Sequence, residues 1–143
     1  MNSSAWKMPP LVLIAVIGLI ALALWYGRAQ EEINATPIPC ADLSGSCTAR
    51  VAGRDISLGI VGKPIALKPF QLWLKAAGAR KVTARFTMQG MNMGINLYIL
   101  HADSAGVFRA SVILPMCVSG RREWTLTVDI DGTRIAVPFV AGP

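Results

Sequence analysis

Apolar and polar side chains alternate along most of the chain from residue 48 onward, and this alternation limits the fold more than any other feature. Successive side chains of a β-strand point to opposite faces of the sheet, so a period of two predicts strands with one buried face. The apolar sets of the expected strands are Ile56, Leu58 and Ile60; Phe70, Leu72 and Leu74; Val82, Ala84, Phe86 and Met88; Ile95, Leu97 and Ile99; Phe108, Ala110, Val112 and Leu114; Trp124, Leu126, Val128 and Ile130; and Ile135, Val137 and Phe139.

Turn signals separate these strands. Asp131-Gly132 predicts a type I′ hairpin between the last two strands, because both central residues of that turn need a positive φ. Ala102 to Gly106 closes an earlier hairpin, and no stretch after residue 30 has a convincing helical period. Seven short strands in residues 48–143 predict an all-β domain, specifically an immunoglobulin-like antiparallel β-sandwich.

An uncharged apolar run from Leu11 to Tyr26 precedes the strands. Together with residues 8–10 it reaches the lower limit for crossing a bilayer, roughly 17 residues. Lys7 lies before the run, and Trp25 and Tyr26 end it, where interfacial aromatic residues are common. We expect either a retained transmembrane helix or a cleaved signal peptide with Gly27-Arg28-Ala29 as its cleavage site. The length of the run favours the anchor, and both alternatives export the rest of the chain.

The expected organisation is therefore an anchor over residues 1–28, a linker over residues 29–47 and a β-sandwich over residues 48–143. Residues 29–39 have no sustained period and carry two prolines, which is typical of an extended tether. Cys40 and Cys47 enclose a Ser-Gly-Ser turn, and this spacing favours a small disulfide loop in an oxidising compartment. The alternative is that these two thiols bind metal or form a redox pair.

Sulfur-bearing side chains gather in two segments. Three of the six methionines, Met88, Met91 and Met93, fall within six residues, and Met116 stands beside Cys117. Thioethers and thiolates are the soft ligands that select Cu(I) over harder ions. Methionine also fills gaps in cores or contributes to partner surfaces. The segment around Met91 and Met93 has the glycine and amide content of a loop, which favours the metal site.

The strand count predicts where these two segments lie. If the strands at 81–88, 94–101 and 107–114 form a meander, the end of the first, the start of the second and the end of the third share one end of the sheet. The predicted Cu(I) ligands are Met91, Met93, Met116 and Cys117, with Met88 as a reserve ligand or the floor beneath them. Arg121 and Arg122 follow closely enough to stabilise a Cys117 thiolate, and we expect Cys117 to remain outside any disulfide.

Several function classes are excluded by composition. The only histidine, His101, ends a strand at the opposite end of the predicted sheet, and we expect it to be a turn or surface residue. One histidine cannot supply a Ser-His-Asp triad near the methionines, and Asp129 and Asp131 flank a turn, so we predict no enzyme. The net charge is +6, but basic and aromatic residues do not interleave, which excludes nucleic acid and favours a surface near anionic lipid.

This combination resembles a known class of proteins. A single N-terminal span, a short tether and a small exported β domain with Met88, Met91, Met93, Met116 and Cys117 is similar to the membrane-tethered periplasmic copper proteins of bacteria. The plan resembles the FixH and YtkA-like families, and the sulfur ligands resemble copper-handling sandwiches of the CopC type. The resemblance implies a single-pass inner-membrane protein with its soluble domain in the periplasm. It also implies a role in supplying copper, in particular to a haem–copper oxidase or another respiratory copper enzyme.

Two hypotheses follow from the sequence. The first is a membrane-anchored Cu(I)-binding protein that acts in copper delivery or homeostasis. The second is a non-metal accessory or assembly subunit, whose β-sandwich binds a membrane complex through its edge or its basic face.

Overall fold

The computed structural model describes residues 10–33, 35–40, 42–88, 96–117 and 119–143. The chain divides into two compact units, Met1–Asn34 and Ala35–Pro143. In the first unit, helix α1 (Pro10–Ile33) includes an 18-residue window, Pro10–Gly27, with a mean hydropathy of 2.3. At about 1.5 Å per residue this window approaches the roughly 30 Å of a bilayer's hydrocarbon core. The helix is thus long and apolar enough to be a membrane anchor or a signal sequence.

The second unit is built from strands, and its described residues contain no helix. In chain order they are β1 (Thr36–Pro37), β2 (Cys47–Val51), β3 (Arg54–Val61), β4 (Pro69–Ala76), β5 (Val82–Thr87), β6 (Leu97–Ala102), β7 (Phe108–Ile113), β8 (Glu123–Ile130) and β9 (Thr133–Val140). The mainly β class predicted from the alternation is confirmed.

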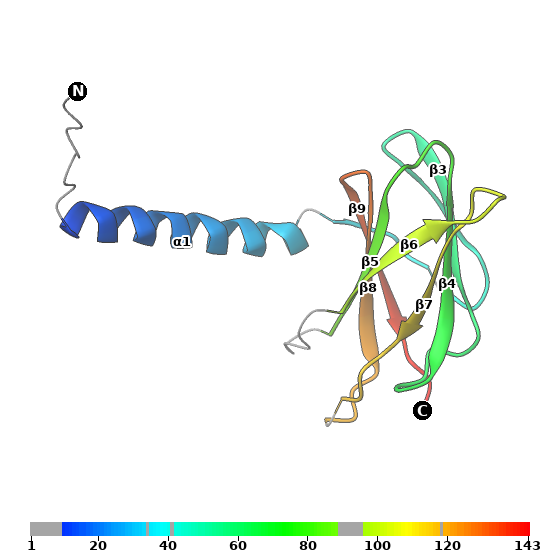
Figure 1. Cartoon of the computed structure of the whole chain (residues 1–143). Coiled ribbons are helices and arrows are strands. Elements are labelled where there is room, and N and C mark those ends of the chain that lie inside the picture. The colour runs from blue at the N-terminus through cyan, green and yellow to red at the C-terminus, as the bar shows by residue number, and fades with distance from the viewer. Residues whose placement is uncertain (1–9, 34, 41, 89–95, 118) are drawn as a thin grey trace. The chain divides into compact units, whose positions relative to one another are not determined.

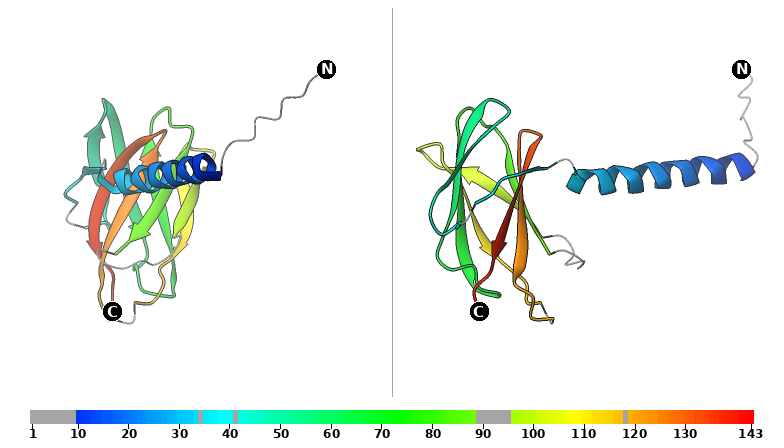
Figure 2. Two further views of the ribbon diagram at one scale, coloured as in Figure 1. Left: turned by 90° about the vertical axis from the view of Figure 1, so that its left-hand side faces the viewer. Right: turned by 180° about the vertical axis from the view of Figure 1, so that it is seen from behind.

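The nine strands form one continuous sheet in the order β1-β9-β8-β5-β6-β7-β4-β3-β2. This sheet curls around the core as a half-barrel (Figure 2), which is not clearly the two-sheet sandwich predicted from the sequence. The reason lies in β6, which pairs with β5 through Leu100↔Val82 and with β7 through His101↔Arg109. One strand thereby joins what would otherwise be two separate layers.

Beyond the backbone pairing, one side chain also joins β6 to β7. The hydroxyl of Tyr98 donates to the carbonyl of Ile113 at 2.7 Å and accepts from the backbone N–H of the same residue at 3.2 Å. The Tyr98 ring also lies edge-on to Phe86, with 5.9 Å between ring centroids. The Tyr98 hydroxyl thus bonds both backbone groups of Ile113, as a backbone partner from β6 would, while its ring packs against the core.

The predicted alternation is confirmed in six strands. Side chains buried there include Ile56, Leu58, Ile60, Phe70, Leu72, Leu74, Val82, Ala84, Phe86, Val112, Leu126, Val128, Ile135 and Val137. In β6 the predicted face is wrong, because Leu97 and Ile99 are 46% and 59% exposed whereas Leu100 is buried. Residues 97–100 are apolar or aromatic on both faces, so the alternation alone could not select the inner one. Ile95 lies outside the described residues.

The expected linker over residues 29–47 is also corrected. Helix α1 continues to Ile33, and residues 35–47 belong to the β unit. The Ile38 N–H donates to the Ala136 carbonyl of β9 at 2.9 Å, and the Leu43 carbonyl accepts from the Ile60 N–H of β3 at 2.7 Å. Both Ile38 and Leu43 are buried. This segment therefore runs from one edge of the sheet to the other and covers the opening between them.

A disulfide fixes the covering segment. Cys40 and Cys47 are bonded, with their Cα atoms 5.8 Å apart, and Cys47 is the first residue of edge strand β2. Between them, the Gly45 carbonyl oxygen approaches Gly59 of β3 so closely that a side chain there would collide with it. The paired Trp73 of β4 covers the same position with its indole ring. Gly59 thus permits the close packing of the loop, β3 and β4.

Gly59→Ala should destabilise the β unit. Its Cβ would meet the Gly45 carbonyl and lie 2.8 Å from the Trp73 ring, so the loop backbone must shift. Overpacking of this kind costs about 1–3 kcal/mol. Chemical denaturation followed by circular dichroism measures the change. Gly45→Ala is the control, because its nearest contact would be 4.0 Å away. Equal stability of the two variants would show that the loop is not packed against Gly59.

Candidate functional site

The ends of β5 and β7 and the starts of β6 and β8 lie at one end of the curled sheet (Figure 1). The Phe86 N–H at the end of β5 donates to the Asn96 carbonyl before β6 at 3.1 Å, and Thr87 pairs with Thr125 of β8. The Tyr98 hydroxyl bonds Ile113, the last residue of β7. We call this the sulfur-bearing end, because the segments after β5 and β7 carry the predicted ligands.

The predicted ligands have different environments. Met88 is 4% exposed and belongs to the hydrophobic core. Met116 is 62% exposed, and Cys117 is a partly buried thiol. Met91 and Met93 lie outside the described residues. The structure therefore describes one surface thioether, one thiol and one buried thioether of the predicted set.

The thiol of Cys117 is polarised by its surroundings. Its Sγ lies 3.0 Å from the Ser119 Oγ, and this hydrogen bond holds the pKa of Cys117 below its usual value. Backbone N–H groups of Ser119 and Arg121 and the charge of Arg121 lower the pKa further, whereas partial burial opposes them. A thiol with a lowered pKa is more often a thiolate, which is both the nucleophile and the metal-binding form.

A buried polar group at this end was not predicted from the sequence. Asn96 is 8% exposed, and its side-chain nitrogen has no hydrogen-bond partner among the described residues. An unpaired buried donor of this kind is destabilising by roughly 1–3 kcal/mol. The only sequence signal was a polar residue inside an expected apolar strand, between Ile95 and Leu97.

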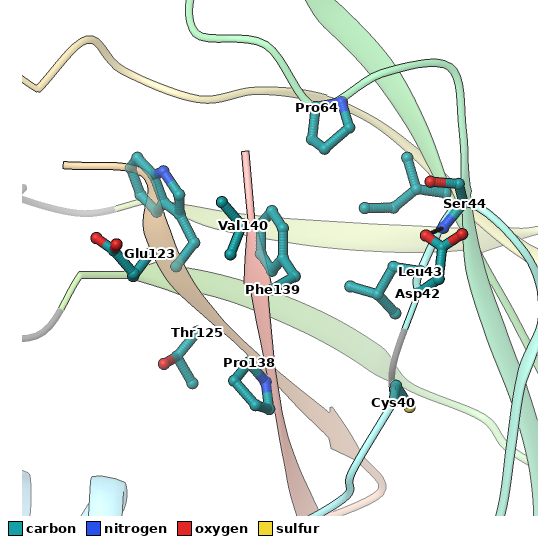
Figure 3. Close-up of a pocket in the computed structure, with 12 residues that line it drawn as sticks. Cys40, Asp42, Leu43, Ser44, Pro64, Glu123, Thr125, Pro138, Phe139 and Val140 are labelled. Carbon is teal, nitrogen blue, oxygen red and sulfur yellow. Dashed lines mark hydrogen bonds between the residues drawn. The ribbon is translucent and has the colours of Figure 1, made fainter. Parts of the chain in front are cut away.

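A pocket opens where the two edges of the sheet face each other (Figure 3). It has a volume of about 490 Å³ and lies between the covering segment, the end of β9, the start of β8 and the turn at Pro64. Its lining comes from Cys40, Asp42, Leu43, Ser44, Ile60, Glu123, Trp124, Thr125, Pro138, Phe139 and Val140 as well as Pro64. No sequence pattern predicted this pocket, because four of its twelve lining residues belong to the disulfide loop of the expected linker and the rest come from distant strands and turns.

Comparison with protein-family models, curated proteins and solved structures found no match to this chain. Within the described ranges, no three His, Cys, Asp or Glu side chains gather as a metal-binding group. Among the described residues of the sulfur-bearing end, the exposed thioether of Met116 is next to the thiol of Cys117 in sequence.

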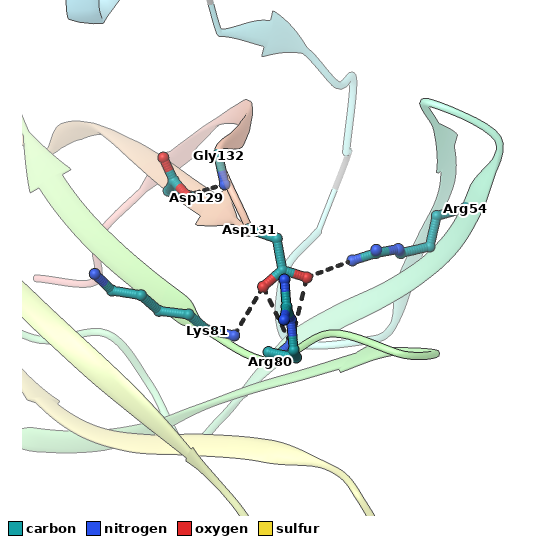
Figure 4. A network of polar contacts seen from close by, with 6 residues as sticks. All are labelled: Arg54, Arg80, Lys81, Asp129, Asp131 and Gly132. Carbon is teal, nitrogen blue, oxygen red and sulfur yellow. Dashed lines mark hydrogen bonds and ion pairs between the residues drawn. The ribbon is translucent and has the colours of Figure 1, made fainter.

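The aspartates near the last hairpin have structural partners (Figure 4). Asp131 and Gly132 have φ values of 52° and 92°, which confirms the predicted turn. The Asp131 carboxylate accepts from the backbone N–H groups of Lys81 at 2.9 Å and Arg80 at 3.1 Å, and it pairs with Arg54 at 3.2 Å. Asp131 thus ties the β8–β9 turn to the start of β5 and to β3.

Asp129 supports the same turn. Its carboxylate accepts from the Gly132 N–H at 2.8 Å and pairs with Arg134 at 3.1 Å. His101, expected to be a turn or surface residue, is exposed in β6 opposite Arg109.

Asp131→Asn should lower stability in a pH-dependent way. The Lys81 N–H, then Arg80 and Arg54, hold the pKa of Asp131 below its usual value, against an opposing effect of burial. Because the pKa of Asp131 is lower in the folded state, the carboxylate stabilises the fold at any pH above its pKa in the unfolded chain, about 3.9. This stability is lost as the pH falls through the lower pKa of the folded state. Asparagine keeps the turn conformation and one acceptor. Denaturation midpoints should separate at pH 7 and converge at low pH, and a constant difference would contradict this role.

Proposed function

We propose that this chain is a membrane-anchored, extracytoplasmic Cu(I)-binding protein that acts in copper delivery or homeostasis, without catalytic activity of its own. The apolar helix α1 and the Cys40–Cys47 disulfide support a location across a membrane in an oxidising compartment. The proposed setting is a bacterial inner membrane with the β unit in the periplasm. The proposed client is a haem–copper oxidase or another respiratory copper enzyme.

The observation that carries the proposal is that the described residues next to two sulfur-bearing segments lie at one end of the sheet. Met88 and Asn96 are the described residues on either side of the segment that contains Met91 and Met93. They lie at the same end of the sheet as the segment after β7 that carries Met116 and Cys117. Sulfur ligands 23 residues apart in sequence can thus belong to one centre.

The chemistry of the ligand set favours Cu(I) and its transfer. The lowered pKa of Cys117 increases the thiolate fraction, which supplies one negative charge for a monovalent ion. Thioethers are neutral and bind more weakly than thiolates, so one thiolate with methionines should release copper more readily than an all-thiolate site. The exposure of Met116 leaves that exchange open to a partner.

The full chain in detergent should bind one Cu(I) and compete with a Cu(I) chelator. Cys117→Ser and the double variant Met91→Ala/Met93→Ala should each weaken this competition by about tenfold or more, because each removes soft ligands. Met8→Ala is the matched control, since Met8 lies in the N-terminal segment before the apolar run. Equal competition by all four proteins would refute the site.

Mass spectrometry of the mature chain in membranes tests the anchor. We expect an intact N-terminal segment in the membrane fraction, because α1 is apolar over 18 residues and exceeds the usual signal-peptide core of about 7–15. A mature chain that begins near Gln30 and is recovered in the soluble fraction would replace the anchor with a signal peptide. The β unit would then still be exported.

One observation favours the alternative function, a non-metal accessory subunit. Leu97, Ile99 and Ile113 are each between 46% and 59% exposed on the outer faces of neighbouring strands β6 and β7. Exposed aliphatic side chains on adjacent strands are typical of a protein-binding surface. If the copper titration shows no binding, these residues become the centre of the functional hypothesis.

A further inference from the structure

The pocket beside the disulfide exists because the curled sheet does not close at that position. On one side of it, the covering segment (residues 35–47) forms backbone hydrogen bonds to β9 through Ile38 and to β3 through Leu43. On the other side, the N–H of Gly142, which follows β9, donates to the Pro64 carbonyl at 2.9 Å. Ile65 and Gly142 also form an isolated parallel β-bridge there. These two closures hold the walls of the pocket at fixed positions. A volume of about 490 Å³ falls within the usual range of small-molecule sites, roughly 300–1,000 Å³.

The lining has an apolar body and charged sides. Leu43, Ile60, Phe139 and Val140 contribute aliphatic and aromatic surface. Asp42 and Glu123 lie on opposite sides of the pocket (Figure 3). The pKa of Asp42 is lowered mainly by a hydrogen bond from the Ser44 side chain and then by one from the Ser44 backbone N–H. Burial raises the pKa by a smaller amount, so Asp42 is a carboxylate at neutral pH.

The charge of the lining identifies the occupant. Its described residues include two carboxylates and no lysine, arginine or histidine, although the whole chain carries a net charge of +6. Arg121 and Arg122 precede Glu123 in sequence but do not line the pocket. An acidic opening over aromatic and aliphatic surface suits a positive group on an apolar body. We propose that this pocket binds a small organic cation, an amine or guanidinium attached to an apolar group, independently of copper.

A charge series of equal size tests the proposal by isothermal titration of the full chain in non-ionic detergent, with empty micelles as the blank. The probes are benzylamine, benzyl alcohol and benzoate. Benzylamine should bind with a Kd of about 1 mM or tighter, as expected for a ligand of its size. Benzyl alcohol should bind at least about tenfold more weakly, and benzoate should not bind. Equal binding of all three, or no benzylamine binding at 10-fold higher concentration, about 10 mM, would overturn the proposal.

Variants assign the binding to the pocket. Asp42→Asn and Glu123→Gln should each weaken benzylamine binding several-fold, and the asparagine keeps the acceptor that bonds the Ser44 N–H. Asp55→Asn is the control, because it changes the net charge equally but pairs with Arg50 and does not line the pocket. Equal weakening by all three variants would indicate a general charge effect and would overturn the site. Copper binding by the same variants should be unchanged, which separates this test from that of the proposed function.

Discussion

A curled sheet that stops short of closing has two edge strands, and their backbone groups need partners. Here β1 and β2 lie at the two ends of the strand order, and residues 35–47 bridge them through hydrogen bonds to β9 and β3. The Cys40–Cys47 disulfide holds that bridge, and Gly59 lets it approach the sheet. An exposed sheet edge is a template for unwanted pairing, so this cover protects the fold as well as completing the core. The pocket lies in the part of the opening that residues 35–47 do not fill.

The sulfur-bearing end depends on a different part of the sheet. Strand β6 belongs to both halves, and the hydrogen bonds of Tyr98 to Ile113 keep the start of β6 beside the end of β7. The segments that precede β6 and follow β7 therefore leave the sheet at the same end. Met116 and the polarised thiol of Cys117 are on one of these segments, with Met88 in the core below.

The sequence predicted β3 to β5 and β7 to β9 because their buried faces are unambiguous, but it did not predict β1 or β2. Strands such as β5 and β8 place every apolar residue on one face and polar residues on the other, so alternation alone identifies the core. In β6 both faces are apolar, and the contacts of Tyr98 with Phe86 and Ile113 decide which one is buried. No local pattern contains that information.

The remaining differences come from interactions between distant parts of the chain. Residues 29–39 carry two prolines and no period and were interpreted as a tether, and residues 40–47 as a small disulfide loop. Ile38 and Leu43 in these segments are nevertheless buried, by strands about 100 and 20 residues away. The pocket could not be predicted from the sequence either, because its lining residues come from distant parts of the chain. The strands predicted at 81–88 and 107–114 end within one residue of β5 and β7, whereas β6 begins at Leu97 and not at residue 94. Antiparallel hairpins fix which strand ends lie together, and this is why the two sulfur segments could be assigned to one end.

X-ray absorption at the copper edge of the full chain, loaded with one equivalent of Cu(I), tests the central claim most directly. The account predicts a first shell of sulfur atoms that loses a sulfur scatterer in Cys117→Ser, because the thiolate of Cys117 is the proposed charged ligand. A first shell of nitrogen and oxygen without sulfur, unchanged in Cys117→Ser, would contradict it.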